Sequence, residues 1–281
     1  MNKIITHGRR WPTRQNVLPP AHRPRAAALL AFSAFAGLIS LPACSPGSEP
    51  DSLGEVSIEE QLSVGVAAGD ESQEFGHVLD VRSAHDGSFF VLDVQGPAIS
   101  WYGADGTLRG GIAVHGEGPG ELASATAIAV HDHQRLAVVD PDNGRIGLYR
   151  FDGDGLGYEG EIAQALSPLN TGGRSICSIG DRLFLRELRG ELLIHELDAT
   201  GQTVRSFEAA VATPAEEFGP FVDVVAPQRN AGHLLCLDEP GLIVSMSRYL
   251  PAVRAFTPDG DLLWETELAN FRPWQIGRAH V

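Results

Sequence analysis

The sequence predicts an all-β fold, a β-propeller of four-stranded antiparallel blades, with about four blades present out of six. Two observations support this prediction. An apolar motif that ends in an acidic residue recurs every 47 residues, at 90–93, 137–140 and 184–187. Each repeat also holds four short apolar runs separated by turn residues, and four strands in a repeat of about 40 to 50 residues are typical of a propeller blade.

The turn that follows each motif repeats with nearly the same period. It ends in Gly106, Gly153 and Gly201, at spacings of 47 and 48 residues, and a fourth copy reaches Gly260 after a further 59. A β-sandwich is the alternative, because its strands also recur about every 8 to 12 residues. A sandwich gives no reason for a turn to repeat at 47 residues, so the propeller is favoured.

Within the second repeat the four expected strands can be placed individually. Each run alternates or is continuously apolar and is bounded by Gly, Asp or Asn. The expected strands are 127–130, 136–139, 146–149 and 156–162. Residues 213–218 are the one segment of this region that we expect to be helical, over a turn or two.

The amino-terminal segment reads as an export signal. Residues 1–43 hold six basic residues and no acidic ones, and residues 26–41 form an uncharged apolar stretch of sixteen. Sixteen residues fall short of the about 20 needed to span a bilayer. A basic region, a short apolar region and small residues before a break are typical of a secretory signal peptide. A buried helix with an incidental cysteine is the alternative.

The end of this segment, Leu41-Pro42-Ala43-Cys44, resembles the lipobox of bacterial lipoprotein precursors, although Pro42 replaces the usual Ser, Thr or Ala. The resemblance implies that Cys44 carries the lipid (palmitate) and becomes the mature amino terminus. Ser45 follows where an Asp commonly retains lipoproteins at the inner membrane, so the resemblance implies delivery to the outer membrane. Residues 44–57 are small, polar and rich in Pro and Gly, which is typical of a flexible tether.

Charge excludes some classes of partner. The chain has a formal net charge of −15, and all 36 acidic residues lie after the predicted signal peptide. So acidic a surface repels phosphate backbones and anionic headgroups, which argues against nucleic-acid binding and against polybasic docking on a membrane.

A glycine-rich loop carries a family resemblance. The loop runs from His115 to Leu122 and reads HGEGPGEL, with Gly116, Gly118, Pro119, Gly120 and Glu121 at its centre. It resembles the linker of bacterial six-bladed propellers related to NHL repeats, which joins the outer strand of one blade to the inner strand of the next. The resemblance covers residues 58–272 and implies that the loop is structural. Weaker copies occur at 69–75 and 215–219. No Gly-Lys-Ser/Thr follows, so a phosphate-binding loop is disfavoured.

The turn at 140–144 reads DPDNG and begins like a calcium loop. An EF-hand needs an acidic residue at the twelfth position, which is Phe151 here. We therefore expect a structural hairpin in which Asp140 accepts hydrogen bonds within the turn, with Asn143 beside it, and pairs with Arg145.

No local motif indicates a metal or a catalytic site. His131-Asp132-His133 is expected to be a solvated turn, and the scattered His77, His115, His195 and His233 lack the spacing that zinc sites commonly use. Calcium-dependent lactonase-type propellers gather acidic and Asn side chains from several blades around the channel. That arrangement leaves no local motif, so it stays open as an alternative.

Cys177 and Cys236 are 59 residues apart, as are the turns of their two repeats. They are therefore expected on the first strands of adjacent blades. Equivalent positions on neighbouring blades are usually farther apart than the about 7 Å between Cα atoms that a disulfide allows. Two buried thiols are favoured, and a disulfide, which export would permit, is the alternative.

The two ends of the repeat region suggest an incomplete propeller. Residues 57–64 are expected to be an outer strand that closes a blade whose other strands come last in the chain. The propeller is expected to span residues 58–275. Residues 276–281, IGRAHV, are what ATC GGA AGA GCA CAC GTC encodes, which resembles a sequencing adapter. The expectation is a truncated reading frame with a non-native tail and six blades in the native protein.

The leading functional expectation is a lipid-anchored propeller of the cell envelope that binds or scaffolds a protein, peptide or glycan at the channel mouth or the top loops, without catalysis or a cofactor. The alternative is an envelope hydrolase or lyase of the lactonase type that uses a divalent metal such as calcium. A third class, a sensor or assembly subunit, differs from the first mainly in its partner. Fold alone does not choose between them.

Overall fold

The computed structural model describes residues 4–5, 59–65, 74–95, 99–112, 114–153, 155–164, 166 and 174–272. The chain divides into two compact units, of which the first comprises residues 1–4 and 62–281 and the second residues 5–61. The expected signal peptide apart from residues 4–5, the lipid-attachment residue Cys44, the whole tether at 44–57 and the tail at 276–281 lie outside the described residues.

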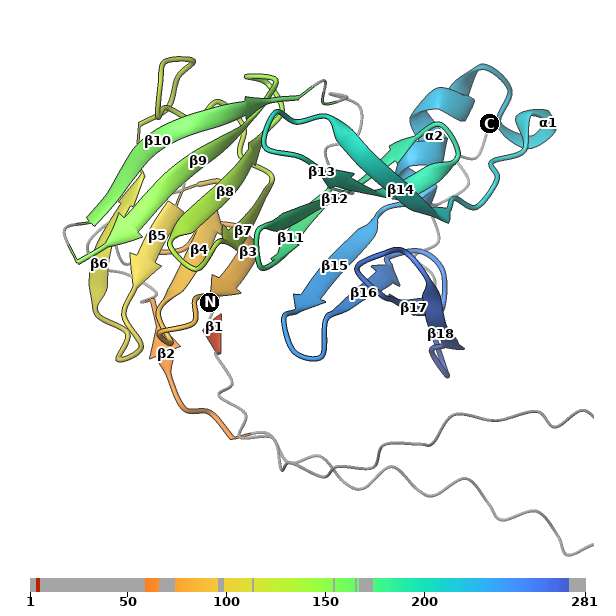
Figure 1. The fold of residues 1–281 in the computed structure, drawn as a ribbon. Helices are drawn as coiled ribbons and strands as arrows, with labels where there is room; N and C mark the ends of the chain where they lie inside the picture. The colour runs from red at the N-terminus through yellow and green to blue at the C-terminus, as the bar shows by residue number, and fades with distance from the viewer. Residues whose placement is uncertain are drawn as a thin grey trace, which may run out of the picture. The chain divides into compact units, whose positions relative to one another are not determined.

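Four antiparallel four-stranded sheets follow one another along the chain (Figure 1). Two short strands, β1 (Ile4–Ile5) and β2 (Ser63–Val64), precede them. Blade 1 consists of β3 (Val78–Ser83), β4 (Phe89–Asp93), β5 (Ile99–Tyr102) and β6 (Leu108–Ile112). Blade 2 consists of β7 (Ala127–His131), β8 (Arg135–Asp140), β9 (Arg145–Asp152) and β10 (Gly155–Ala163).

Blade 3 consists of β11 (Ser175–Ile179), β12 (Arg182–Arg189), β13 (Leu192–Leu197) and β14 (Thr203–Ala209). Blade 4 consists of β15 (Gly232–Leu237), β16 (Leu242–Ser247), β17 (Ala252–Phe256) and β18 (Leu262–Glu267). In every blade the strands pair in chain order. The predicted fold class, an all-β propeller of four-stranded blades with four copies, is confirmed, and all four strands predicted for the second repeat are present.

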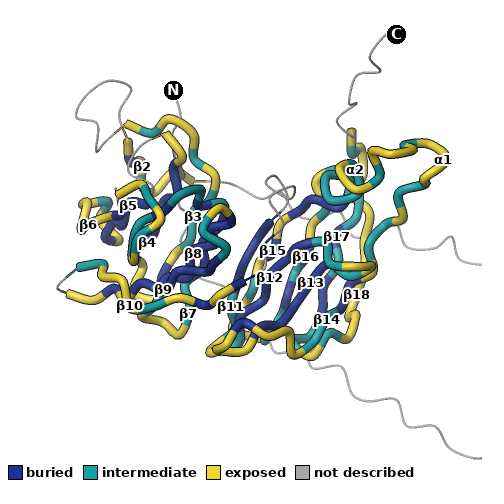
Figure 2. Tube along the Cα trace, turned by 90° about the horizontal axis from the view of Figure 1, so that it is seen from above, coloured by how far each residue is buried: buried dark blue, intermediate teal, exposed yellow. Residues whose placement is uncertain are grey.

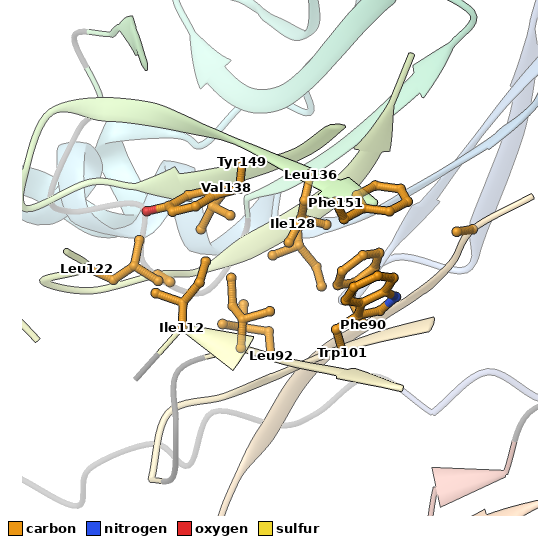
Figure 3. Close-up of a cluster of buried hydrophobic side chains, with 13 residues drawn as sticks. Phe90, Leu92, Trp101, Ile112, Leu122, Ile128, Leu136, Val138, Tyr149 and Phe151 are labelled. Carbon is orange, nitrogen blue, oxygen red and sulfur yellow. The ribbon is translucent and has the colours of Figure 1, made fainter. Parts of the chain in front are cut away.

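Apolar clusters hold each blade against the next. The cluster between blades 1 and 2 contains Phe90 and Trp101 on one side and Ile128, Leu136 and Phe151 on the other (Figure 3). Similar clusters join blade 2 to blade 3 and blade 3 to blade 4. The second strand of each of the first three blades is almost wholly buried (Figure 2). Because each large apolar side chain stabilises the fold by about 1.5–3 kcal/mol when fully buried, these clusters dominate the packing energy.

The first strand of every blade lines a common cavity of about 380 Å³, to which β3, β7, β11 and β15 all contribute. Arg82 crosses between these strands: its Nε donates to the carbonyl of Ile128 at 3.0 Å and its Nη2 to the carbonyl of Ile176 at 3.4 Å. Asp80 lies 3.3 Å from the same guanidinium and accepts from the backbone N–H of Ile128. Burial raises the pKa of Asp80, although Arg82 opposes this effect.

The face of blade 1 that points away from blade 2 is covered by residues that precede the blade in the sequence. Phe89 and Tyr102 are buried there against Leu62, Val64 and Phe75. The strand expected at 57–64 is therefore present only as β2, two residues long, within the described part of this segment, and it packs on blade 1.

The connection from blade 3 to blade 4 is helical. It contains α1 (Ala215–Phe218), the 3-10 turn η2 (Gly219–Phe221) and α2 (Val222–Arg229). The helix expected at 213–218 corresponds to α1. The weaker linker copy at 215–219 lies in the connection between two blades, but it is helical and not a glycine-rich loop. We did not predict α2, because it buries none of its residues and contains Pro227, so it carries no helical apolar pattern. No helix in the described ranges is long and apolar enough to cross a membrane.

Cys177 and Cys236 form a disulfide between β11 and β15, with their Cα atoms 5.6 Å apart. The expectation of two free thiols is therefore wrong. Cys177 packs with Phe184 on the side of blade 3 that meets blade 4, and Cys236 packs on the facing side of blade 4 beside Ile243. Residues 59 apart hold the same position in the repeat, so the sequence suggested that the two cysteine side chains lie on the same face of their blades. A shift of one residue within a strand reverses the face on which a side chain lies, and the two cysteines therefore face each other.

Candidate functional site

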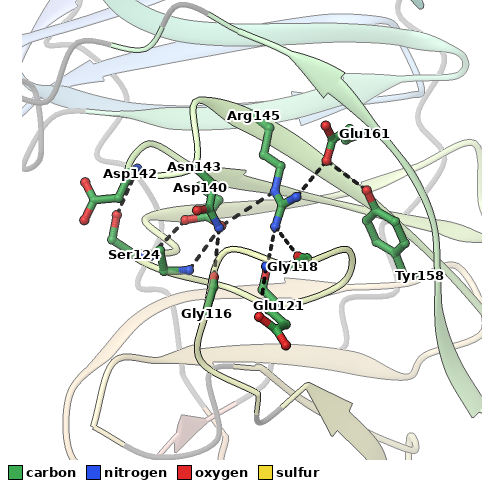
Figure 4. Close-up of polar contacts among 11 residues, drawn as sticks. Gly116, Gly118, Glu121, Ser124, Asp140, Asp142, Asn143, Arg145, Tyr158 and Glu161 are labelled. Atoms are coloured by element: carbon green, nitrogen blue, oxygen red, sulfur yellow. Dashed lines mark hydrogen bonds and ion pairs between the residues drawn. The ribbon is translucent and has the colours of Figure 1, made fainter.

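The glycine-rich loop and the DPDNG turn lie together, linked by side chains of the turn (Figure 4). Arg145 donates from Nη2 to the carbonyl oxygens of Gly118 and Glu121, both at 2.8 Å. Asn143 donates from Nδ2 to the carbonyl of Gly116 at 3.0 Å. Glu121 closes the loop on itself by accepting from the backbone N–H of Gly118 at 2.9 Å. Pro119 and Gly120 form the tip between these contacts, and Gly120 has a positive φ of 78°.

Asp140 organises the other side of this arrangement. Its carboxylate is fully buried and accepts from the backbone N–H groups of Ala123 at 3.2 Å and Ser124 at 2.8 Å, and from Nδ2 of Asn143 at 2.7 Å. Arg145 lies 4.0 Å away. These contacts satisfy a buried charge by hydrogen bonds, as burial requires.

Blade 1 repeats the same arrangement 47 residues earlier. Asp93 accepts from the backbone N–H groups of Gly76 at 2.7 Å and His77 at 2.8 Å. In blade 3 the corresponding Glu187 is buried and accepts instead from Arg174. An acidic residue at the end of the second strand therefore fixes the start of the blade, which explains why the 47-residue motif ends in Asp or Glu.

The outer end of the Arg145 network reaches the blade surface. Glu161 accepts from Arg145 at 2.7 Å and from the hydroxyl of Tyr158 at 2.9 Å. The hydrogen bond from Arg145, followed by that from Tyr158, lowers the pKa of Glu161. The named side chains of this network bond to one another, so it offers a well-fitted linker rather than a ligand cavity.

The packing of turn glycines against the neighbouring blade differs at one junction, and a cavity lies there. The glycine in the turn before the last strand of a blade lies against the outer strand of the preceding blade. A Cβ at Gly201 would be 2.6 Å from Cγ2 of Ile162 in β10, and one at Gly260 would be 3.0 Å from the ring of Phe207 in β14. Gly153 is the aligned residue of the second repeat, but it lies in a shorter hairpin, in which Asp152 already pairs with Gly155, and a Cβ there would meet nothing within 4 Å. The regular contact between blades 1 and 2 is thus absent at this turn.

A pocket of about 950 Å³ occupies this place. We call it the blade 1–2 pocket. Gly153 and Gly155 of the turn line it together with Asp152. The charged, polar and aromatic side chains that line it are His85, Asp86, Trp101 and Arg109 from blade 1 and His133 and Phe151 from blade 2.

Trp101 and Arg109 form one wall of the pocket. The guanidinium of Arg109 lies over the indole, 5.3 Å from the ring centroid, and its Nη1 is 3.3 Å from a carboxylate oxygen of Asp86. Hydrogen bonding from Ser88 is the largest of the effects that lower the pKa of Asp86. Trp101 is 3% exposed, and its Nε1–H has no hydrogen-bond partner in the described structure. Figure 3 shows this nitrogen on the side of the indole that faces away from the apolar cluster.

His85 and His133 form the rim that the pocket shares with the central cavity. Their rings meet edge to face with centroids 5.7 Å apart. His133 has a positive φ of 55°, whereas the turns of blades 1 and 3 place Gly87 and Gly180 in that region. A non-glycine residue in the left-handed region costs about 1 kcal/mol or more, and such strain is frequent at functional sites.

The other histidines that the sequence suggested as possible ligands are dispersed. His131 ends β7, and burial lowers its pKa; Asp132 and His133 form the turn. His195 is buried, with Nδ1 2.8 Å from Oγ of Ser206 and Nε2 2.9 Å from the carbonyl of Glu187. No group of three or more His, Cys, Asp or Glu that could hold a metal ion occurs among the residues that the structure describes.

The sequence did not single out Trp101, Arg109 or His85. Trp101 looks like an ordinary core residue in the strand pattern, and the pocket arises from the position of one turn, which no local motif encodes. A detectable signal was present at His133, because the corresponding turns of the other two repeats carry glycine.

No protein-family model matches the chain, and no curated protein sequence is similar to it. Solved structures are similar in fold. A putative exported protein from Bacteroides fragilis superposes with a TM-score of 0.50 at 10% identity, over 71% of this chain and 52% of that protein. A streptogramin B lyase gives 0.44 at 16% identity, over 74% and 58%. Virginiamycin B lyase from Staphylococcus aureus gives 0.44 at 13% identity, over 69% and 56%. The chain spans between about half and three fifths of the length of these structures.

Proposed function

We propose that this chain is an exported β-propeller, anchored to the bacterial outer membrane through a lipid on Cys44, that binds a protein, peptide or glycan in the blade 1–2 pocket. The observation that carries the binding proposal is the pocket of about 950 Å³ at a place where blades 1 and 2 lack the turn contact that the later blades make.

Two independent features support export. The amino-terminal sequence has the order of a signal peptide followed by a lipobox-like Leu-Pro-Ala-Cys. The disulfide between Cys177 and Cys236 requires an oxidising compartment, since disulfides are rare in reducing cytosol and persist outside it.

Two features of the pocket support ligand binding. It replaces a contact that blade 3 makes with blade 2 through Gly201 and that blade 4 makes with blade 3 through Gly260, so it is a local departure from the repeat. The left-handed His133 adds strain at the same place.

The lining suits a ligand with both polar and apolar groups. Arg109 supplies donors, Asp86 and Asp152 supply acceptors, and the rings of Trp101 and Phe151 supply apolar surface. Such mixed linings are found where peptides and sugars bind, because orientation comes from a few placed polar groups and affinity from apolar contact.

The proposal is tested by screening the lipid-free chain, from residue 45 onward, against peptide and glycan arrays and measuring hits by titration calorimetry. Arg109→Gln removes the guanidinium from the pocket wall, so a ligand that bonds to it should bind about tenfold more weakly. His133→Gly should raise thermal stability, because the strain is removed, and should weaken binding.

Asn270→Gly is the matched control. Asn270 also has a positive φ, 61°, but does not line the pocket, so this variant should become more stable while ligand affinity stays unchanged. If array hits bind wild type, Arg109→Gln and His133→Gly with equal affinity, the pocket is not the binding site.

A further inference from the structure

The disulfide between Cys177 and Cys236 lies in the wall of the central cavity, at the edge of a packed cluster. Both cysteines line this cavity of about 380 Å³. Their side chains differ in exposure. Cys177 is 6% exposed and belongs to the buried cluster that contains Phe184, whereas Cys236 is partly exposed and packs on the margin of that cluster. A small molecule in the cavity therefore meets the Cys236 side of the bond first.

The junction of blades 3 and 4 keeps other contacts when the bond is open. The backbone N–H of Leu234 donates to Oγ of Ser175 at 2.9 Å, and the backbone N–H of Gly180 donates to Oδ1 of Asp238 at 2.9 Å. The buried cluster at this junction also contains apolar side chains of both blades. Opening the disulfide should therefore leave blade 4 packed on blade 3 and the protein folded.

Carboxylates give the cavity a negative lining near the disulfide. Asp238 lies two residues after Cys236, and Asp132 of blade 2 lines the same cavity. Arg82 lines it too, but its charge is compensated, since Asp80 lies 3.3 Å from its guanidinium. Such a lining attracts a positively charged molecule and repels a negatively charged one.

We infer that this disulfide is a site of reversible thiol–disulfide exchange in the folded protein, reached through the central cavity. A cavity of about 380 Å³ admits a small molecule, so the co-reactant is a low-molecular-weight thiol, and the carboxylates favour one with a positive charge. The inference goes beyond the proposed function, because it needs neither a ligand in the blade 1–2 pocket nor a lipid on Cys44.

The exchange takes place in two steps. The thiolate attacks Sγ of Cys236 and forms a mixed disulfide, while the bond to Cys177 breaks and Cys177 leaves as a thiolate that takes a proton from water. A second thiol then attacks the mixed disulfide and releases Cys236 as a thiol. Two small thiols are thus oxidised to one disulfide, and the protein disulfide is reduced by two electrons.

The first test compares three thiols that differ in charge: cysteamine, 2-mercaptoethanol and 2-mercaptoethanesulfonate. They react with the Cys44→Ala protein, whose remaining cysteines are Cys177 and Cys236, and intact mass follows the reduction. Each rate is divided by the thiolate concentration and by the rate with oxidised glutathione as a reference disulfide. At low ionic strength cysteamine should react about threefold faster than the sulfonate or more, and about 1 M salt should remove the difference. Equal normalised rates would overturn the inference.

The same reaction distinguishes exchange in the folded protein from exchange after unfolding. Urea below the unfolding transition should change the rate constant by less than about twofold, because the thiol reaches the bond without global opening. The far-UV circular dichroism should stay unchanged while the disulfide is reduced. A rate constant that rises steeply with urea, in proportion to the unfolded fraction, would show that the bond reacts after unfolding and would contradict the inference.

Asp238→Asn tests the route through the cavity. It removes the charge and keeps Oδ1 as the acceptor for Gly180, so the preference for cysteamine should fall by about half or more. Asp223→Asn is the matched control, because Asp223 is exposed on α2 and does not line the cavity. It should leave the preference unchanged. An equal preference in both variants would place the approach of the thiol elsewhere and would refute the cavity route.

The choice of sulfur is tested with single cysteines. In the Cys44→Ala background, Cys177→Ala leaves the thiol of Cys236, which should react with 5,5′-dithiobis(2-nitrobenzoate) about tenfold faster or more than the thiol of Cys177 in Cys236→Ala, since buried cysteines are inert. Acid-quenched mixtures of the protein with its disulfide intact and cysteamine give the same information without these variants. Peptide mapping should locate the mixed disulfide on Cys236, and its location on Cys177 would overturn the inference.

Discussion

Cys177 and Cys236 join the innermost strands of blades 3 and 4 through a disulfide, and they face each other across the junction of the two sheets. The closed loop contains the whole outer part of blade 3 and the helical connection, since the two residues are 59 apart in sequence. The bond therefore restricts the unfolded chain over a long segment, and it ties blade 4 to blade 3.

Removing this bond should lower stability. Replacing both residues, Cys177→Ala and Cys236→Ala, should reduce the free energy of unfolding by about 2–4 kcal/mol, as is typical for a loop of this length. Denaturant titration of wild type and double variant measures the difference. Reductant should destabilise the wild type to the same extent and leave the double variant unchanged. A wild-type intact mass that does not increase by two hydrogen atoms on reduction would contradict the disulfide.

The turn glycines provide a matched pair for testing the blade junctions. Gly201→Ala places a Cβ 2.6 Å from the carbonyl oxygen of Ala163, at a residue with a positive φ of 84°, so it should destabilise the protein by about 2 kcal/mol or more. Gly153→Ala, in the same turn of blade 2, meets nothing within 4 Å and should be tolerated. Thermal unfolding of the two variants measures the contrast, and equal effects would show that the turn does not contact the outer strand of the preceding blade.

Asp140 should be among the most sensitive positions of blade 2. Asp140→Ala leaves two backbone N–H groups and the amide of Asn143 without their acceptor, and it should cost about 3 kcal/mol. Asp142→Ala, two residues away on the exposed side of the turn, should change stability by less than about 0.5 kcal/mol. Denaturant titration gives both values. Tolerance of Asp140→Ala would refute the structural role that we assign to this turn.

Stability at high pH should depend on Tyr149. Burial raises the pKa of Tyr149 from 10.0 to about 12 in the folded protein. Between these values the unfolded state loses the phenolic proton and the native state keeps it, so stability falls as the pH rises from about 10 to 12. Melting curves of wild type and Tyr149→Phe measure this, and the variant should show a smaller fall.

At neutral pH the Tyr149→Phe variant should be no less stable than wild type. The hydroxyl of Tyr149 is buried and has no hydrogen-bond partner among the described residues, so its removal relieves a desolvated polar group. A loss of more than about 1 kcal/mol would indicate a partner for this hydroxyl.

Membrane attachment should depend on Cys44. In a bacterial host, Cys44→Ala should release the processed protein from the membrane fraction, because the thiol that we propose as the lipid acceptor is absent. Ser45→Ala is the control and should leave partition unchanged. Immunoblots of soluble and membrane fractions measure both, and unchanged partition of Cys44→Ala would contradict lipid anchoring.

The repeat was predictable from the sequence because its causes are local. The 47-residue period follows from Asp93, Asp140 and Glu187, each of which fixes the start of its own blade through side-chain hydrogen bonds. The strand pattern follows from the alternation of side chains between two packed faces. The helix α2 was not predicted because it buries no residue and so leaves no apolar pattern in the sequence. The disulfide was not predicted because a shift of one residue in a strand moves a side chain to the other face of the sheet.

The pocket could not be predicted for a different reason. It depends on the absence of a contact at Gly153, whose sequence context, Asp-Gly, is the same as in the turn that ends in Gly106. Whether such a turn packs on the neighbouring blade depends on residues of two repeats at once. A single repeat therefore contains no signal for the pocket, apart from His133 at a position where other repeats carry glycine.

The fit of each turn glycine to the blade before it limits how this protein can change by gene duplication. A duplicated blade has to make two contacts. Its turn glycine has to pack against the outer strand of the blade before it, as Gly201 and Gly260 do, and its own outer strand has to pack against the turn glycine of the blade after it. Blades are therefore gained or lost as whole repeats. The junction at Gly153 lacks this contact, so substitutions there meet a weaker packing constraint than substitutions at Gly201 or Gly260.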